Sequence, residues 1–206
     1  MEKTKNKILR VSLELFNEQG LAKVTLRTIA NELGISQGNL NYHFKKREDI
    51  LEALYFSLVE HINEQVQGQM KNGVTLQFMM DLTTSVMEIL ADYRFLMLDL
   101  VQIMRENERI GTHFRQLVQG RKDQFEIFFK VLVANGIMRK EELPNEYDHF
   151  YTRIQMLGDY WISYAEVINQ VNARTNINQY IQILSQSIYP YLTEKGKEEF
   201  NMLKLG

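Results

Sequence analysis

The stretch GISQGNLNYHF (residues 34–44) decides the fold of the first part of this chain, because it ends one amphipathic helix and begins another. The helix before it is predicted over residues 26–33, with Thr25 as its N-cap. Gly34 favours the left-handed backbone that ends a helix, and Ser36 is placed to cap the next one. A further amphipathic helix precedes these two. Three short helices with so tight a connection predict a helix-turn-helix unit.

The third of these helices has an unusual outward face. On a helical wheel its apolar residues Leu40 and Phe44 point into the small core of the unit. The opposite side lacks the Glu, Lys and Ala of an ordinary solvated helix and holds instead Gly38, Asn39, Asn41 and Tyr42. A glycine permits close approach of the backbone, and an asparagine amide offers a donor and an acceptor to a base edge. This face therefore predicts contact with DNA.

Further groups beside this face suit phosphates. Tyr42 and His43 can donate hydrogen bonds to phosphate oxygens, as can the backbone amides at the helix N-terminus near Ser36 and Gln37. The basic run of residues 45–47 follows and can neutralise flanking phosphates. Two other interpretations stay open: His43 can hydrogen-bond within its own unit, and the basic run can be an ordinary solvated helix start.

The rest of the chain also has a helical period. A long helix is predicted from the KKRED run towards Gln67, followed by helices over residues 74–91, 93–107, 110–135, 145–170 and 176–193. The sequence has two prolines and no strand-like alternation. The predicted fold class is all-α, with an N-terminal three-helix helix-turn-helix domain (residues 1–47) and a larger helical ligand-binding and dimerisation domain (residues 48–206).

Composition narrows the class of protein. The 206 residues are 45% hydrophobic and 24% charged, as in ordinary globular proteins, and none is cysteine. The lack of cysteine excludes a disulfide scaffold, a cysteine-based zinc site and a cysteine nucleophile. No uncharged apolar run approaches the roughly 18 residues of a membrane span, and the N-terminus is amphipathic, unlike a signal peptide. We therefore expect a cytoplasmic protein with no membrane partner.

Charge and histidine placement bear on function. Residues 1–50 carry nine Lys and Arg against six Asp and Glu, whereas the remainder carries fifteen against twenty. The basic N-terminal end is a modest indication of a polyanion partner. The four histidines are scattered, without a His-x-x-x-His pair, and no glycine-rich phosphate loop occurs. We therefore expect no enzymatic activity, no metal site and no cofactor.

The segment TLRTIANELGISQGNLNYHFKKREDIL resembles the DNA-binding segment of the TetR family of bacterial repressors. The family pattern is an Ile-Ala pair, then Gly-x-Ser-x-Gly-x-Leu, then an aromatic-rich stretch that ends in His-Phe-x-x-Lys/Arg-Glu. The match covers about the first 50 residues. The chain departs from the pattern at Asn41, where many members carry Tyr, so one expected phosphate contact is in doubt there or becomes a base contact.

The resemblance implies a set of DNA contacts. They come from the start of the second helix (Thr25 and Arg27), from the recognition helix and from a basic residue that opens the fourth helix (Lys46 or Arg47). The recognition-helix contacts that it implies are Ser36, Gln37, Gly38, Asn39, Tyr42 and His43.

The last two predicted helices are apolar on more than one face, so each must bury two surfaces. One surface can be the subunit's own core and the other a partner subunit, although a single large core is the alternative. The TetR resemblance implies that these two helices pair with their copies in a homodimer, and Gly158 would permit close helix approach. The predicted dimer residues are Tyr151, Ile154, Gly158, Trp161, Ile162, Ile181, Leu184 and Ile188.

The middle helices are rich in methionine and phenylalanine, which suits either a ligand cavity or a plain core. The resemblance favours a site for a small-molecule effector without identifying its residues. The candidate pocket residues are Phe78, Tyr93, Met97, Asp99, Met104, Phe125 and Phe128.

The sequence thus predicts a homodimeric, ligand-responsive transcriptional regulator. We expect a repressor that a small apolar molecule releases from a palindromic, double-stranded DNA operator. A second hypothesis is a DNA-binding regulator that is controlled by a protein partner or by no ligand, with the C-terminal body serving dimerisation alone. A third is an all-α enzyme or carrier with an incidental helix-turn-helix resemblance.

Overall fold

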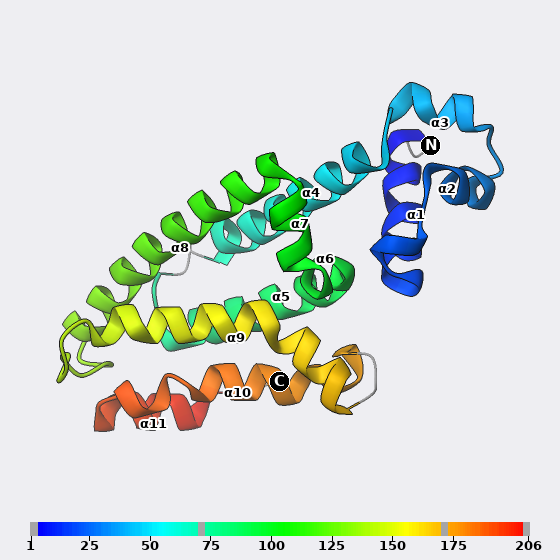
Figure 1. The fold of residues 1–206 in the computed structure, drawn as a ribbon. Helices are drawn as coiled ribbons and strands as arrows, with labels where there is room; N and C mark the ends of the chain where they lie inside the picture. The colour runs from blue at the N-terminus through cyan, green and yellow to red at the C-terminus, as the bar shows by residue number, and fades with distance from the viewer. Residues whose placement is uncertain (1–3, 70–72, 170–172, 204–206) are drawn as a thin grey trace. The chain divides into compact units, whose positions relative to one another are not determined.

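The computed structural model describes residues 4–69, 73–169 and 173–203 (Figure 1). Within these residues no strand forms, and Met138 and Leu192 make only an isolated antiparallel bridge. The predicted all-α class is confirmed. Short 3₁₀ helices are η1 (Leu21–Lys23), η3 (Ala173–Asn176) and η4 (Tyr189–Tyr191). The α-helices are α1 (Thr4–Gln19), α2 (Leu26–Leu33), α3 (Gln37–His43), α4 (Arg47–Gln69), α5 (Leu76–Asp92), α6 (Arg94–Leu98), α7 (Leu100–Glu106), α8 (Glu108–Ala134), α9 (Glu146–Asn169), α10 (Ile177–Gln186) and α11 (Glu194–Met202).

Local capping fixes the ends of α2 and α3 where the sequence predicts them. The Thr25 hydroxyl accepts a hydrogen bond from the Thr28 N–H at 3.1 Å, and the Ser36 hydroxyl accepts one from the Asn39 N–H at 3.2 Å. Gly34 has φ 65°, the left-handed conformation that ends α2. The helix-turn-helix connection is therefore set by residues 34–36 themselves.

The chain divides into two compact units. The first, unit 1, comprises residues 1–61 and 93–112, and the second, unit 2, comprises residues 62–92 and 113–206. The predicted boundary between residues 47 and 48 falls at the start of α4, whereas the compact units divide within α4 and assign α6 and α7 to unit 1. The assignment of functional domains to residues 1–47 and 48–206 stays a prediction.

In unit 1, α6 is attached to α1 by aromatic stacking and by hydrogen bonds. The rings of Phe16 and Phe95 stack with centroids 4.9 Å apart. The Phe95 N–H donates to the Asn17 side-chain oxygen at 3.0 Å, and the Arg94 guanidinium donates to the Asn17 carbonyl. Burial raises the pKa of Asp99, and the hydrogen bond that its carboxylate accepts from the Leu21 N–H has a smaller, opposite effect. These long-range contacts explain why α6 and α7 belong to unit 1.

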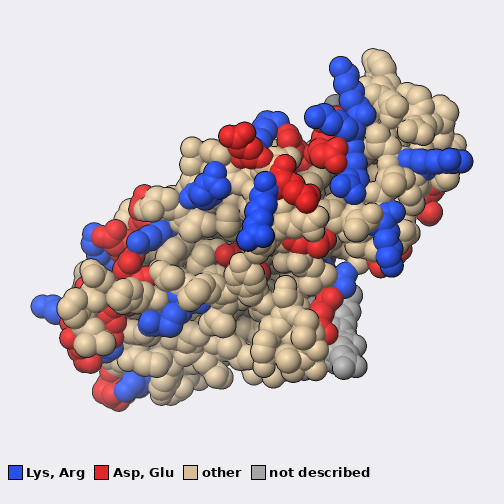
Figure 2. Space-filling model, viewed as in Figure 1, with Lys and Arg blue, Asp and Glu red and all other residues tan. Residues whose placement is uncertain are grey.

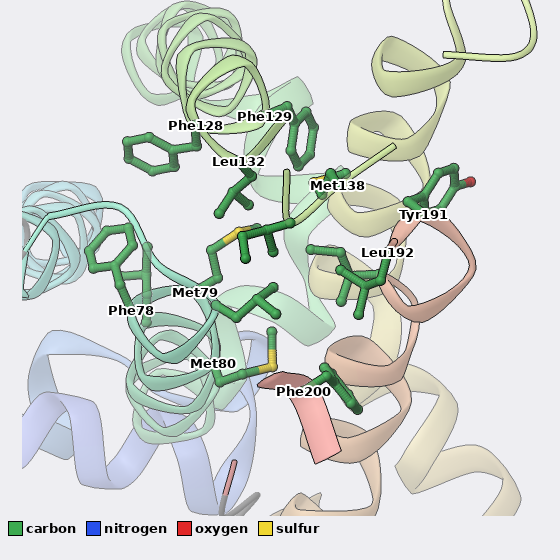
Figure 3. Close-up of a cluster of buried hydrophobic side chains, with 14 of the residues drawn as sticks. Phe78, Met79, Met80, Phe128, Phe129, Leu132, Met138, Tyr191, Leu192 and Phe200 are labelled. Carbon is green, nitrogen blue, oxygen red and sulfur yellow. The ribbon is translucent and has the colours of Figure 1, made fainter. Parts of the chain in front are cut away.

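Unit 2 has a core of large apolar side chains. Figure 3 shows side chains from α5, from α8 and from the segments after α8 and α10 pointing toward one another. The rings of Phe150 and Tyr191 stack at 4.4 Å, and those of Phe78 and Phe128 meet edge to face at 5.4 Å. This cluster joins segments distant in sequence into one core.

Two predicted helices are interrupted. Residues 93–107 form α6 and α7 with a break at Asp99, whose backbone (φ −101°, ψ 16°) leaves the helical region. The helix that was predicted over residues 176–193 ends at Gln186, and a separate helix, α11, begins after Thr193. The Thr193 hydroxyl caps α11 by accepting the Gly196 N–H at 3.1 Å. The sequence analysis missed α11, although Pro190 and the Thr193 cap were local signals for a break.

We expect Gly196→Ala to destabilise unit 2. A Cβ at this position would lie 2.2 Å from the Ile137 carbonyl oxygen and 3.2 Å from the Leu192 Cβ. In an open helix this change would stabilise the fold by up to about 1 kcal/mol, but overpacking here costs about 1–3 kcal/mol. Urea unfolding measures the difference. The matched control is Gly120→Ala in α8, where no neighbouring atom lies within 4 Å of the added Cβ. Equal or raised stability in both variants would contradict the close packing of α11.

A bidentate ion pair between Arg139 and Glu146 stabilises the segment between α8 and α9. The Arg139 guanidinium donates to both carboxylate oxygens of Glu146, at 2.9 and 2.7 Å, and the Glu142 N–H donates to the same carboxylate at 2.8 Å. The Arg139 hydrogen bonds are the main cause that lowers the pKa of Glu146 from 4.5 to about 2. The ionised form of Glu146 is thus favoured in the folded protein.

This ion pair gives a pH-dependent contribution to stability. Because the pKa of Glu146 is lower in the folded chain, its contribution is present above pH 4.5 and is lost as pH falls from 4.5 towards about 2. We expect Glu146→Gln to lower the melting temperature at pH 7, and the difference from wild type to shrink through that range. Thermal unfolding at pH 7 and pH 3 checks this. Glu126→Gln, which removes an exposed pair with Lys130, should have little effect at either pH.

Candidate nucleic-acid interface

Helix α3 presents the face that the sequence predicts. Leu40 is fully buried and Phe44 is 4% exposed, so these two side chains hold the helix against unit 1. Tyr42 on the opposite side is 86% exposed. Gln37, Gly38, Asn39 and Asn41 are also exposed. In Figure 2 the surface over α3 carries no charged side chain, while basic side chains lie beside it.

The polar side chains of this face are free to bind another molecule. Within the described residues, the amides of Gln37, Asn39 and Asn41 make no hydrogen bond to the protein. His43 likewise makes none there, and its ring meets the Tyr42 ring edge to face at 5.2 Å. The alternative that His43 hydrogen-bonds within its own unit therefore gains no support from the described contacts.

Gly38 has no role inside the protein that only glycine can fill. Its φ lies outside the left-handed region, and a Cβ added to it would meet only the Ser36 hydroxyl oxygen, at 3.9 Å. Glycine generally weakens a helix relative to alanine. Nothing inside unit 1 therefore requires a glycine at position 38, and its predicted role in a close approach of DNA stays a prediction.

The helix N-termini supply further donors beside α3. The hydroxyl oxygens of Thr25 and Ser36 accept hydrogen bonds from backbone N–H groups, and the Ser36 hydroxyl can still donate its proton to an acceptor such as a phosphate oxygen. The hydroxyl oxygens of Thr25 and Thr28 lie 2.9 Å apart, so one of these two hydroxyls donates to the other and the accepting one keeps a proton to donate. Arg27 is exposed and makes no ion pair within the described part of the chain. These groups are suited to phosphate contacts.

The structure gives different surroundings to Lys46 and Arg47, which were predicted as alternative phosphate contacts. The Asp49 carboxylate accepts the N–H groups of Lys45 and Lys46, both at 3.0 Å, and so fixes the turn before α4. Lys46 is exposed, with no ion pair among the described residues. The Arg47 guanidinium donates to the Leu21 carbonyl at 3.1 Å and lies 3.5 Å from the Glu48 carboxylate. Lys46 is therefore the better candidate for a phosphate contact, and Arg47 has a structural role.

A basic residue that the sequence analysis did not select also lies beside α3. The Lys5 ammonium lies 5.6 Å from the centroid of the Phe44 ring, at the C-terminal end of α3. It adds a positive charge at the C-terminal end of α3, beside the side of that helix that carries Phe44. No local pattern relates Lys5 to Phe44, because they meet only through the folding of α1 onto α3.

The candidate pocket residues are divided between the two units. Phe78, Phe125 and Phe128 pack together in unit 2, where the ring of Phe125 lies 5.9 Å from that of Phe128. The other four belong to unit 1, where they are Tyr93, Met97, Asp99 and Met104. Tyr93 is hydrogen-bonded through its hydroxyl to Ser57, and Asp99 to the Leu21 N–H, so both polar groups serve the fold of unit 1. A pocket formed by this set stays a prediction.

Most of the predicted dimer residues are buried within their own subunit. Ile162 is fully buried, and five others are at most 8% exposed, namely Tyr151, Trp161, Ile181, Leu184 and Ile188. These six side chains therefore have little exposed surface to give to a partner, and their place in a dimer interface stays a prediction. Ile154 is partly buried against the same core, and Gly158 is partly exposed.

Within the described residues, no group of three or more His, Cys, Asp or Glu side chains is placed to hold a metal ion. The helices of the same residues include none with the length and apolar composition needed to cross a bilayer.

The all-α fold and the exposed face of α3 define a helix-turn-helix DNA-binding protein. A family model described as bacterial regulatory proteins of the tetR family matches residues 8–54, and the model described as bacterial transcriptional repressor, TetR, matches residues 57–200. Because the second match alone spans more than half of the chain, the chain belongs to the TetR family of DNA-binding transcriptional regulators. This confirms the resemblance carried by residues 25–51 and extends it over the C-terminal body.

Individual relatives agree with this assignment. The chain is 23% identical over 155 residues to the probable HTH-type transcriptional regulator YttP of Bacillus subtilis, covering 75% of this chain and 74% of that protein. It resembles the crystal structure of a TetR-family transcriptional regulator from Marinobacter aquaeolei VT8, with a TM-score of 0.81, 26% identity and coverage of 97% and 96%. The ketosteroid transcriptional regulator KstR2 of Mycobacterium tuberculosis shares the fold, with a TM-score of 0.71 and 16% identity over 94% and 97% of the chains.

Proposed function

We propose that this protein is a cytoplasmic, homodimeric repressor that binds a palindromic DNA operator and is released by a small apolar molecule. The observation that carries the DNA part is the exposed face of α3, where three amides have no hydrogen-bond partner within the described residues. The proposed contacts are those predicted from sequence, with Lys46 preferred over Arg47 and with Lys5 added.

An exposed apolar stripe on α9 supports the homodimer. Its members recur every three or four residues and are 40–73% exposed, which is unusual for so many large apolar side chains on one helix face. They are Met156, Leu157, Tyr160, Tyr164, Val167 and Ile168. Ile183 of α10, in the same unit, is 44% exposed. We propose this α9 stripe, in place of the buried set, as the surface that meets a second copy.

Dimerisation and operator symmetry are linked. A helix-turn-helix dimer places its two recognition helices about 34–36 Å apart, so that each enters the major groove of one half-site. A two-fold protein therefore selects a palindromic site.

The effector part of the proposal rests on the composition of unit 2 and on the family. The core of unit 2 contains adaptable methionines and aromatic rings, including Met79, Met80, Phe125 and Phe128, a composition that suits an apolar ligand. A ligand that binds one arrangement of the body better than another would change the DNA affinity by that difference. The alternative is control by a protein partner or by none.

Selection from a random DNA library tests the DNA part. We expect the purified protein to enrich a palindrome and to bind it with an affinity that falls steeply as salt increases. Failure to enrich any site would overturn the proposal. A panel of apolar compounds then tests the effector part, with the melting temperature and release of the selected DNA as readouts. DNA binding without a response to any compound would favour the alternative.

We expect Lys46→Ala to weaken binding to all DNA sequences about equally and to reduce the slope of log K against log salt by about 1. The physical reason is the loss of one exposed cation beside α3. Filter binding at several salt concentrations measures the slope. Arg47→Ala should differ by lowering the melting temperature, because the Leu21 carbonyl loses its hydrogen-bond donor. An unchanged salt slope in Lys46→Ala would remove Lys46 from the interface.

A further inference from the structure

Three polar side chains of α9 form a hydrogen-bonded row in unit 2. The Tyr151 hydroxyl lies 3.1 Å from the Gln155 side-chain oxygen, and the Gln155 amide donates to the Asp159 carboxylate at 2.8 Å. Because the three residues are spaced four apart, they follow one side of the helix. Tyr151 is 4% exposed, and Gln155 and Asp159 are partly buried. These three residues are called the α9 polar row below.

Asp159 has no cationic partner within the described residues, where the Gln155 amide is its one hydrogen-bond donor. Burial raises the pKa of Asp159 to about 6, and the hydrogen bond from Gln155 has a smaller, opposite effect. The carboxyl group is still mainly ionised at pH 7. A carboxylate can accept about four hydrogen bonds, so Asp159 keeps most of its capacity unused. The row therefore ends in a partly buried negative charge without a counter-ion.

The same contact occurs in unit 2 without burial. On α5 the Gln77 amide donates to the Asp81 carboxylate at 2.7 Å, also four residues away, but both of these side chains are exposed. Such a pair is an ordinary helix contact, and water solvates the charge of Asp81. Asp159 differs because it is partly withdrawn from water. Uncompensated buried charge is unfavourable for folding and is concentrated at binding sites.

A positive charge lies near the other end of the row. The partly buried Arg121 guanidinium of α8 donates to the side-chain oxygens of Asn63 and Gln124, and it has no carboxylate partner within the described residues. Burial raises the pKa of Tyr151 to about 12, and the nearby charges of Asp159 and Arg121 shift it further in opposite directions. Arg121 therefore repels a cation from the Tyr151 end, whereas Asp159 attracts one to the opposite end.

We propose that the α9 polar row binds an amphipathic amine, with the ammonium group paired to Asp159. The ammonium group can donate to the Asp159 Oδ2 atom, since the Gln155 amide occupies Oδ1. The apolar part of the ligand lies against the aromatic side chains beside the row. The ring of Phe125 lies 5.2 Å from that of Tyr151 and packs against the core of unit 2. This inference rests on the effector part of the proposed function and narrows the effector to molecules with a basic nitrogen.

The experiment compares three matched compounds on the DNA-free protein: 4-phenylbutylamine, its neutral N-acetyl derivative and 4-phenylbutyric acid. We expect the amine to raise the wild-type melting temperature more than the other two compounds do. Asp159→Asn keeps the shape of the side chain but removes its charge, and it should abolish this preference. In titration calorimetry the variant should bind the amine about 10- to 150-fold more weakly, because one charge-assisted hydrogen bond is lost, with binding of the neutral compound nearly unchanged.

The ligand-free proteins give a second readout. We expect Asp159→Asn to melt at an equal or higher temperature than wild type, because the uncompensated charge is gone. A lower melting temperature without loss of amine preference would show that Asp159 serves the fold alone. Asp81→Asn is the matched control, since it changes the same pair of residue types on the surface, and it should respond to the three compounds as wild type does.

The inference is overturned if the three compounds act alike on wild type or if Asp159→Asn keeps the preference for the amine. A preference for the acid that Arg121→Gln removes would also overturn it, because the site would then bind anions. If Asp159→Asn does not fold, the wild-type comparison still decides which charge the ligand carries. Release of the selected DNA separates this inference from the proposed function. If neutral compounds release DNA and no amine depends on Asp159, the inference alone fails, whereas an amine that binds through Asp159 and leaves DNA bound removes the effector role.

Discussion

Tyr160→Arg is expected to convert the protein from a dimer to a monomer and to weaken operator binding by about 10²- to 10⁴-fold. Tyr160 lies in the middle of the α9 stripe and is 48% exposed. A charge placed there would be buried without a partner on dimerisation, which is strongly unfavourable. Once the two recognition helices are no longer linked, the gain from binding two half-sites together is lost. Sedimentation equilibrium and binding to the selected palindrome measure the two effects.

The matched control for this prediction is Ile127→Arg. Ile127 is 58% exposed, on α8 and outside the α9 stripe, so the same change there should leave the dimer and its DNA affinity near wild type. Thermal unfolding of both variants shows whether each retains its fold. If Tyr160→Arg remains a dimer while folded, the α9 stripe is not the interface.

Gly38→Ala and Gly38→Leu are expected to reduce DNA affinity in a graded way without harming the fold. Inside the protein the added Cβ meets only the Ser36 hydroxyl, at 3.9 Å. Alanine should leave stability unchanged or raise it by up to about 1 kcal/mol, because glycine is the weaker helix former. We expect Gly38→Ala to weaken specific binding by about tenfold and Gly38→Leu by about 100-fold, since a side chain here keeps α3 from the bases.

Two measurements on the same samples decide this second prediction. The free energy of unfolding should stay equal or rise, while the affinity for the selected site falls. Gly120→Ala, in the exposed part of α8, serves as the control that changes helix propensity alone. If both Gly38 variants bind DNA as wild type does, α3 does not approach the DNA at this residue.

The local parts of the fold were predictable because local chemistry determines them. Thr25, Gly34 and Ser36 each act through groups within a few residues, so the caps and the left-handed turn follow from the sequence directly. The outward face of α3 followed from helical geometry and from the burial of Leu40 and Phe44. The same reasoning wrongly predicted one helix over residues 93–107. The break at Asp99 is accompanied by contacts from α1 and η1, which are distant in sequence and leave no local signal.

The candidate site was predictable to a similar extent. Its exposed residues on α3 were identified from composition and from the family pattern. The separate roles of Lys46 and Arg47 were not, since they depend on whether a guanidinium reaches the Leu21 carbonyl, 26 residues away in sequence. Lys5 was missed for the same reason, because its neighbour Phe44 is distant along the chain.

The sequence by itself therefore determined the all-α class, the helix-turn-helix unit and the polar face of α3 that is exposed in the structure. Only the tertiary structure decided which side of α9 is buried. Trp161 and Ile162 face the core, whereas their neighbour Tyr160 is exposed, although all three are large and apolar. Helical periodicity shows that such a helix has two apolar sides, but the side that becomes core depends on packing against α8 and α10, distant in the chain. For that reason six of the eight predicted dimer residues pack in the core of unit 2, and the proposed interface lies on the neighbouring, exposed side of α9.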